Sequence, residues 1–90
     1  MYKIVVSKQF EKDFKLAKKR GLDLTRLETV VNLLASGKVL PKRYRDHSLG
    51  GNYRDFRECH IRPDWLLIYR IEKDELMLFL FRTGSHSDLF

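Results

Sequence analysis

Residues 65–83 read WLLIYRIEKDELMLFLFRT, and this stretch decides the fold. Residues 65–71 are almost all apolar and predict a strand, residues 72–74 predict a tight turn, and residues 75–83 predict a second strand. Because residues 76–81 are apolar on both faces, the second strand should lie inside a covered sheet. The stretch therefore predicts an antiparallel pair of strands at the centre of the domain.

A third strand precedes this pair. Residues 53–60 alternate imperfectly between polar and apolar side chains. The next segment, Arg62-Pro63-Asp64-Trp65, places proline at the second position of a type I turn. Three strands joined in this way form an antiparallel meander, and the first half of the chain must supply the cover for its apolar face.

The first half predicts a short strand and then a helix. Residues 2–6 are rich in β-branched side chains and predict the strand. Ser7 is placed to cap a helix over residues 8–20, because its side-chain oxygen can accept a free backbone N–H group. The apolar stripe of this helix consists of Phe10, Phe14 and Ala17.

A second helix follows after a few residues. Thr25 and Glu28 have the spacing of a capping box, which predicts a start near Leu24, and Gly37 ends the helix. Residues 38–52 predict an irregular, basic connection. The expected fold is α+β in the order β-α-α-β-β-β, with a helical hairpin packed on a mainly antiparallel twisted sheet.

Length and composition fit a single small domain over residues 1–90. The 90 residues are 43% hydrophobic and 33% charged, so the chain is too apolar to be disordered and too short for a multi-domain cofactor enzyme. The net charge of +6 is uneven, because residues 1–45 carry 12 basic and 4 acidic side chains and residues 46–90 carry 6 and 8. The basic half favours a polyanion such as nucleic acid, or an acidic protein partner, although basic side chains also serve solubility alone.

The sequence carries no sign of an oxidising compartment, a membrane or secretion. Cys59 is the only cysteine, which excludes an internal disulfide and predicts a small buried side chain on a strand. No stretch approaches the roughly 20 apolar residues of a membrane span. Residues 1–7 lack the apolar run of a signal peptide. We therefore expect a cytoplasmic protein with no membrane partner.

Several polar side chains should meet at one end of the meander. The 53–60 strand ends there, the 65–71 strand starts there, and the 75–83 strand ends there. This end would gather His60, Asp64, Trp65, Arg82 and His86. Two imidazoles, a carboxylate and a guanidinium can serve as an acid–base and anion-stabilising site. The topology does not place His47 at this end.

Each of these residues also has a structural explanation. A histidine at a strand end often acts as a polar cap, Asp64 suits a turn, and Trp65 suits the core. A metal site is the rival chemistry, and its usable ligands would be His47, His60, Asp64 and His86. The scattered spacing and the cationic Arg82 argue against it, so we expect neither a metal nor another cofactor.

Three blocks of sequence, each with one histidine, extend over the second half of the chain. Residues 44–51 read YRDHSLGG, residues 56–69 read FRECHIRPDWLLIY, and residues 82–90 read RTGSHSDLF. In this order they resemble the RelE/ParE superfamily of small bacterial toxins, in its YafQ-like branch. With two helices ahead of the meander, the resemblance covers essentially the whole chain and implies the RelE-like fold.

The resemblance also implies a function. It implies a toxin of a type II toxin–antitoxin system, an endoribonuclease that cleaves mRNA in the A site of the 30S ribosomal subunit and is neutralised by a cognate antitoxin. It implies phosphate contact by Arg82 and a place near the substrate for Phe90. The residues that match the active site of the family are His47, His60, Asp64 and His86.

Metal-free RNA cleavage needs a base for the 2′-hydroxyl, a stabiliser of negative charge and an acid for the 5′-oxygen. His60 and His86 suit the base and acid roles at neutral pH, and Asp64 can orient an imidazole. Trp65 and Phe90 suit stacking on splayed bases. Contacts to the ribosome or RNA are expected from basic side chains of the first helix and the connection: Lys8, Lys12, Lys15, Lys18, Lys19, Lys42, Arg43 and Arg45.

Two hypotheses without catalysis stay open. A ParE-like toxin would share the fold but inhibit DNA gyrase and cut nothing. A basic nucleic-acid-binding module would contact phosphates through the first half of the chain alone. The gathering of histidines argues against the gyrase inhibitor, because such a toxin needs no acid–base pair.

Overall fold

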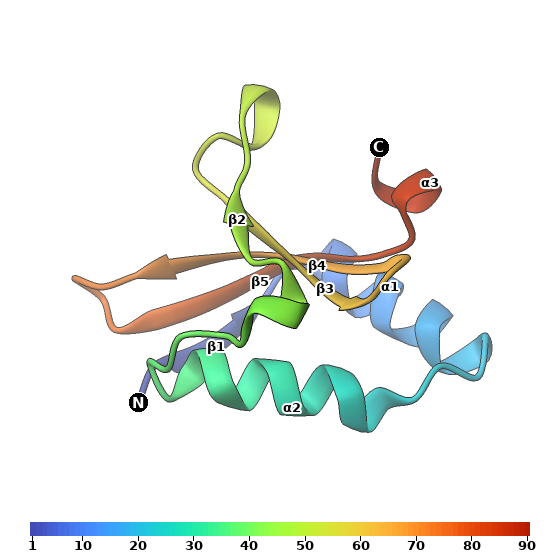
Figure 1. The fold of residues 1–90 in the computed structure, drawn as a ribbon, viewed down its shortest axis with the longest axis horizontal. Helices are drawn as coiled ribbons and strands as arrows, with labels where there is room; N and C mark the ends of the chain where they lie inside the picture. Colours follow the sequence, from blue (N-terminus) through green and yellow to red (C-terminus); the bar gives the residue numbers. More distant parts are fainter.

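Five strands form one twisted sheet in the computed structural model, which describes residues 1–90 (Figure 1). Their order across the sheet is β1-β5-β4-β3-β2. β1 and β5 are parallel, and all other neighbours are antiparallel. The strands are β1 (Lys3–Val6), β2 (His47–Ser48), β3 (Arg57–Arg62), β4 (Trp65–Glu72) and β5 (Met77–Gly84). The predicted α+β fold with a mainly antiparallel sheet is confirmed.

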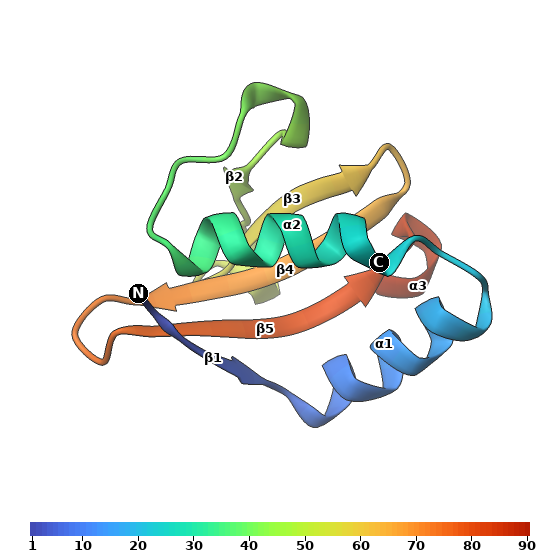
Figure 2. The ribbon, with the colours of Figure 1, turned by 90° about the horizontal axis from the view of Figure 1, so that it is seen from below.

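The helices lie on both sides of this sheet. Figure 1 shows α1 and α2 on one side and α3 on the other. Figure 2 shows α2 crossing β4 and β3 while α1 lies beside β5, so the two diverge from their connecting loop. None of the helices is long and apolar enough to cross a membrane. The helices are α1 (Lys8–Lys19), α2 (Leu24–Ala35) and α3 (His86–Leu89), with single 3₁₀ turns η1 (Lys42–Tyr44) and η2 (Gly51–Tyr53).

The caps of the two long helices follow local side-chain chemistry. Ser7 caps α1 as predicted, and its Oγ accepts the backbone N–H of Phe10 at 2.8 Å. The capping box predicted for Thr25 and Glu28 is wrong. Asp23 caps α2 instead, and its carboxylate accepts the backbone N–H of Thr25 at 3.1 Å. Aspartate is among the strongest capping residues, so it takes the capping position in place of Thr25.

Both faces of the central strands are covered. On the α1–α2 side, Leu78 and Leu80 of β5 belong to the main core. On the α3 side, Phe81 packs against a smaller cluster that is centred on Leu66, Ile68 and Leu89. The prediction of a covered interior strand agrees with this two-sided burial for residues 77–81, but β5 begins at Met77 rather than at residue 75, and Leu76 lies in the preceding turn and is 63% exposed.

The second half of the chain departs from the prediction in three places. The strand expected from residue 53 begins at Arg57, because residues 51–53 form η2. The connection before it contains the two-residue strand β2, whose His47 pairs with Glu58. Ser85 caps α3, which the sequence pattern did not predict, through a capping box with Asp88. The last two of these features position histidines: β2 carries His47, and α3 begins with His86.

Candidate active site

The meander brings its polar ends together as the topology predicts. His60 of β3 pairs with Leu66 of β4, and Leu66 pairs with Gly84 of β5. His86 follows Gly84 by two residues, at the start of α3. The rings of His60 and His86 consequently lie with centroids 5.7 Å apart.

Asp64 and His86 form the tightest contact at this end. Asp64 Oδ1 accepts the backbone N–H of His86 at 2.9 Å and lies 2.6 Å from the ring Nδ1. The two hydrogen bonds, the backbone one foremost, lower the pKa of Asp64. The carboxylate is therefore ionised at neutral pH and accepts a hydrogen bond from Nδ1–H, which leaves Nε2 of His86 free for proton transfer.

α3 is tied to the rest of the fold through Asp88. The Asp88 carboxylate accepts the backbone N–H of Ser85 at 2.9 Å and the Arg20 guanidinium at 2.7 Å. The hydrogen bond from Arg20 is the main reason why the pKa of Asp88 lies far below its ordinary value. The helix that carries His86 is thus fastened to the C-terminal end of α1.

His47 also reaches the site, which the topology alone did not show. The short strand β2 sets it beside β3, and its ring centroid lies 6.3 Å from that of His60. Its Nδ1 lies 2.7 Å from the carbonyl oxygen of Arg45. Because a carbonyl only accepts, Nδ1 carries the proton in this contact. Three imidazoles thus lie in a row, with His60 between His47 and His86.

A carboxylate that the sequence pattern did not reveal lies beneath this row. Glu58 is only 5% exposed, and its Oε1 lies 3.5 Å from Nε2 of His47 and 3.5 Å from Nε2 of His60. The Nε2 atoms of both rings therefore lie close to the same carboxyl oxygen. The missed signal is strand periodicity, because Glu58 and His60 are two residues apart and share one face of β3.

A polar network positions the segment before His47. Asp46 accepts two hydrogen bonds from Arg57, both at 3.2 Å, and one from the Tyr69 hydroxyl. Burial, and next the bond to Asp46, raise the pKa of Tyr69, so its hydroxyl stays protonated and donates. These hydrogen bonds of Asp46 hold the start of β2 beside β3.

Two predicted site residues have structural contacts in this fold. Trp65 is 3% exposed, and its indole Nε1 donates to the Thr83 hydroxyl at 3.0 Å. The prediction that Trp65 stacks on a base is therefore wrong, because its ring is enclosed in the core. Arg82 forms a two-point pair with Asp13 of α1, at 2.8 and 3.2 Å. Only its Nη1 group makes no hydrogen bond within the chain.

The remaining predicted contacts lie on the surface. Phe90 is 63% exposed, and its ring meets that of Tyr53 edge to face with centroids 5.6 Å apart. The basic side chains predicted to contact RNA are all exposed: Lys8, Lys12, Lys15, Lys18, Lys19, Lys42, Arg43 and Arg45. Cys59, in contrast, is fully buried, and burial raises the pKa of its thiol, which makes it an unreactive core residue.

The rival hypothesis of a metal site depends on how these imidazoles and carboxylates are arranged. No three His, Cys, Asp or Glu side chains converge closely enough to hold a metal ion. Asp64 Oδ1 is engaged by His86 through two contacts. The imidazoles of His47 and His60 direct their Nδ1 groups at backbone carbonyls, which leaves Nε2 as the second ring nitrogen of each.

Comparison with known proteins gives relatives that match nearly the whole chain. The mRNA interferase toxin YafQ of Escherichia coli strain K12 is 43% identical over 88 residues, which cover 97% of this chain and 94% of the relative. A crystal structure of a metal-bound toxin from Helicobacter pylori has 52% identity and a TM-score of 0.94, with full coverage of both chains. A crystal structure of the Escherichia coli DinJ–YafQ complex has 41% identity and a TM-score of 0.91, covering 100% of this chain and 99% of the other.

The family comparison extends over nearly the whole chain. Residues 2–90 match the family described as the bacterial toxin of type II toxin–antitoxin system, YafQ. The match includes β2, β3 and α3, the three elements that carry the row of histidines. By family match, sequence identity and shared fold, this chain belongs to the YafQ family of type II bacterial toxins.

Proposed function

We propose that this chain is an mRNA interferase that cleaves mRNA in the ribosomal A site by metal-independent acid–base chemistry. The observation that carries the proposal is the row of three imidazoles, His47, His60 and His86, held by two carboxylates at one end of the sheet. Support comes from relatives that match nearly the whole chain and are named mRNA interferase toxins.

The chemistry requires two proton transfers around one phosphorus. The 2′-oxygen attacks phosphorus and loses its proton to a base, a bond forms between them, and the bond from phosphorus to the 5′-oxygen breaks as an acid protonates that oxygen. The products are a 2′,3′-cyclic phosphate and a free 5′-hydroxyl. Neighbouring imidazoles such as His60 and His86 suit the two roles, because histidine gains and loses protons near neutral pH.

The two carboxylates have different tasks in this mechanism. Asp64 holds His86 by Nδ1 and so directs Nε2 at the substrate. Glu58 lies 3.5 Å from Nε2 of both His47 and His60, where it can orient either ring toward the substrate. Negative charge on the phosphorane would be met by Nη1 of Arg82, the group of that guanidinium that the Asp13 pair leaves free.

Partners follow from the same assignment. A cognate antitoxin is proposed because the relative YafQ has been crystallised with DinJ. The ribosome and its mRNA are proposed as the targets, with exposed lysines of α1 and the Lys42–Tyr44 turn contacting phosphates. Phe90 is exposed beside the site and suits stacking on a base. The proposed compartment is the cytoplasm, where these partners reside.

The decisive experiment combines the purified protein, programmed ribosomes and a defined mRNA, with and without EDTA. Cleavage should occur on the ribosome, resist EDTA as judged against a ribosome-integrity control, and leave a cyclic or 3′-phosphate end. His86→Ala serves as the inactive control. Efficient cutting of free RNA would contradict the A-site assignment, and loss of cutting after metal is stripped from the toxin alone would contradict the metal-free one.

A parallel assay addresses the non-catalytic hypotheses. Inhibition of gyrase supercoiling with intact mRNA would favour a ParE-like toxin. RNA binding without cleavage, on or off the ribosome, would favour a basic binding module. The acid–base row at His60 and His86 favours the nuclease over both.

A further inference from the structure

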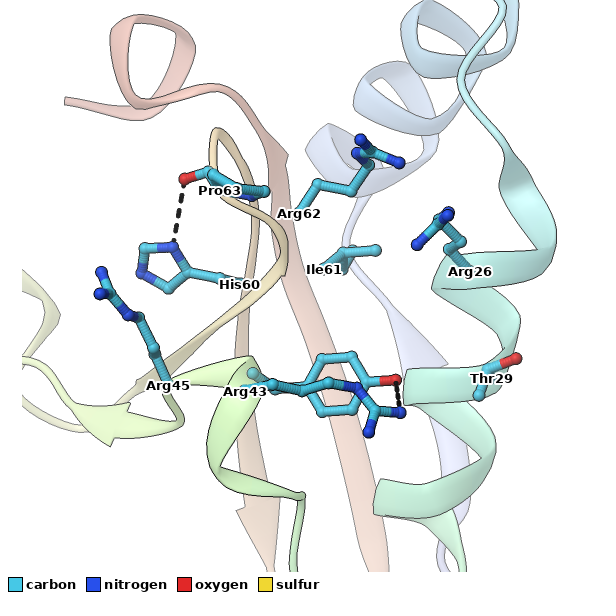
Figure 3. A pocket seen from close by; sticks show the side chains of 9 residues that line it. Arg26, Thr29, Arg43, Arg45, His60, Ile61, Arg62 and Pro63 are labelled. Atoms are coloured by element: carbon cyan, nitrogen blue, oxygen red, sulfur yellow. Dashed lines mark hydrogen bonds between the residues drawn. The ribbon is translucent and has the colours of Figure 1, made fainter.

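A basic pocket of about 610 Å³ opens beside the row of histidines (Figure 3). Its walls come from α2, from η1 and the residue after it, and from the end of β3 with the following turn. Four of its nine lining residues are arginines: Arg26, Arg43, Arg45 and Arg62. His60 also lines this pocket, so the pocket and the candidate active site share one side chain.

The arginines of the pocket lack the partners that most arginines elsewhere in the fold possess. Outside the pocket, Arg20, Arg57, Arg70 and Arg82 each contact a carboxylate at 3.2 Å or less. In the pocket, only Arg26 contacts one, at 3.8 Å, and its partner Asp23 is exposed. No acidic residue lines the pocket. Three of the four cations therefore have no carboxylate partner, and an anion bound among them would reduce their mutual repulsion.

One of the arginines, Arg43, has its guanidinium held in place without losing its charge, and the backbone of Arg45 is fixed beside it. Arg43 stacks on the ring of Tyr44, with its guanidinium carbon 4.7 Å from the ring centroid, and donates to the Tyr44 hydroxyl at 3.1 Å. Tyr44 is itself buried in the core. Arg45 adopts a left-handed conformation with φ of 50°, and its carbonyl accepts from His47. A pre-positioned guanidinium loses less entropy when it binds an anion.

We propose that this pocket binds phosphate groups of the RNA strand next to the phosphate that is cleaved, an inference that rests on the proposed function. Guanidinium groups match the geometry of phosphate oxygens by paired hydrogen bonds. A phosphodiester strand that passes His60 would enter the pocket directly, since that side chain borders both sites. The binding adds affinity on one side of the cleaved bond and fixes the register of the strand.

The lining favours a phosphate over the carboxylates of a protein partner. Its two hydrophobic residues, Tyr44 and Ile61, are 9% and 5% exposed and belong to the core. The pocket therefore offers no accessible apolar anchor of the kind that dominates protein interfaces. Its chemistry is that of a backbone-binding groove for a polyanion.

The test uses an RNA oligonucleotide that carries 2′-methoxy groups throughout and so cannot be cleaved. Its binding is measured by fluorescence anisotropy at several salt concentrations. The variant is Arg26→Gln combined with Arg62→Gln, two exposed positions outside the proposed catalytic machinery. The matched control is Lys38→Gln with Lys73→Gln, which removes the same charge at exposed residues that follow the C-terminal ends of α2 and β4.

The pocket variant should bind the oligonucleotide about tenfold more weakly. The slope of log K against log salt should fall by about 1.4, because each lost phosphate contact on a single strand contributes about 0.7. The control should retain both values. Equal losses in variant and control would show a diffuse charge effect and overturn the inference.

Further arms separate this inference from the proposed function. If the wild type cleaves mRNA on the ribosome but the pocket variant binds RNA normally, the inference fails and the function stands. If the wild type cleaves nothing but the variant still loses RNA affinity as expected, the pocket assignment stands and the function fails. Unchanged RNA affinity with loss of antitoxin affinity would make the pocket a carboxylate-binding dock and overturn the inference.

Discussion

Replacement of Asp13 by asparagine should destabilise the domain strongly. This carboxylate is 8% exposed and accepts four hydrogen bonds: two from Arg82, at 2.8 and 3.2 Å, one from the backbone N–H of Thr83 at 3.1 Å, and one from Gln9 at 3.1 Å. An amide has one accepting oxygen and one donating nitrogen, so two of these donors must face another donor.

The loss of stability depends on which orientation of the new amide breaks fewer hydrogen bonds. Its nitrogen would take the position of Oδ1, because Gln9 can turn its own amide and accept, and one bond from Arg82 is then lost. A hydrogen bond to a charged group contributes roughly 1.5–3 kcal/mol, and the second bond from Arg82 loses its charged acceptor at a further cost of about 1 kcal/mol. The Asp13→Asn variant should therefore lose about 3 kcal/mol. For a domain of this size, that lowers Tm by about 12–24 °C.

Urea unfolding monitored by tryptophan fluorescence measures this loss directly. Trp65 is the only tryptophan and is buried, so its emission reports global unfolding. The control is Glu11→Gln, which removes an exposed carboxylate from the same helix and should change stability by less than about 0.5 kcal/mol. A loss below about 1 kcal/mol for Asp13→Asn would show that the pair behaves as an exposed ion pair and refute the reasoning.

The remaining predictions concern the site. His60→Ala and His86→Ala should each reduce mRNA cleavage by roughly 10²–10⁴-fold without unfolding the protein; unchanged circular dichroism with normal cleavage would locate the chemistry elsewhere. Trp65→Phe should cost about 1–3 kcal/mol in chemical denaturation, because Thr83 loses its buried partner, while cleavage per folded molecule stays normal; a selective loss of activity would restore the stacking role. The hydrogen bonds from His86 lower the pKa of Asp64, so the stability that this pair provides is present at pH above the ordinary aspartate pKa of about 3.9 and is lost as pH falls below it. The free energies of unfolding of wild type and Asp64→Asn should therefore converge at low pH. A difference between them that widened at low pH would contradict the direction of this pKa shift.

The fold and part of the site follow from sequence because they depend on periodicity and topology. Once residues 53–83 are recognised as a meander, its tight turns force the ends of its strands together. His60, Asp64 and His86 meet for that reason, although they are far apart in the chain. Two-sided apolar patterning in residues 76–81 likewise identifies β5 as a covered strand from the amino-acid pattern alone.

The rest depends on features too local for that reasoning. His47 joins the site through a strand of only two residues, which no pattern in an irregular connection predicts. Glu58 could have been found from its spacing to His60, but a charged residue on a strand is usually solvated, and its burial is a tertiary fact. Arg82 and Trp65 have partners, Asp13 and Thr83, whose proximity comes from the packing of α1 on β5 and of β4 on β5.

The parallel pairing of β1 with β5 determines when the complete sheet can form during synthesis. β1 leaves the ribosome first, yet Lys3 pairs with Met77, which is made much later. Since such distant contacts form only when both strands are available, the sheet cannot close before β5 has been made. For the proposed activity on ribosomes, this order means that the active site assembles only after β5 and α3 have been made.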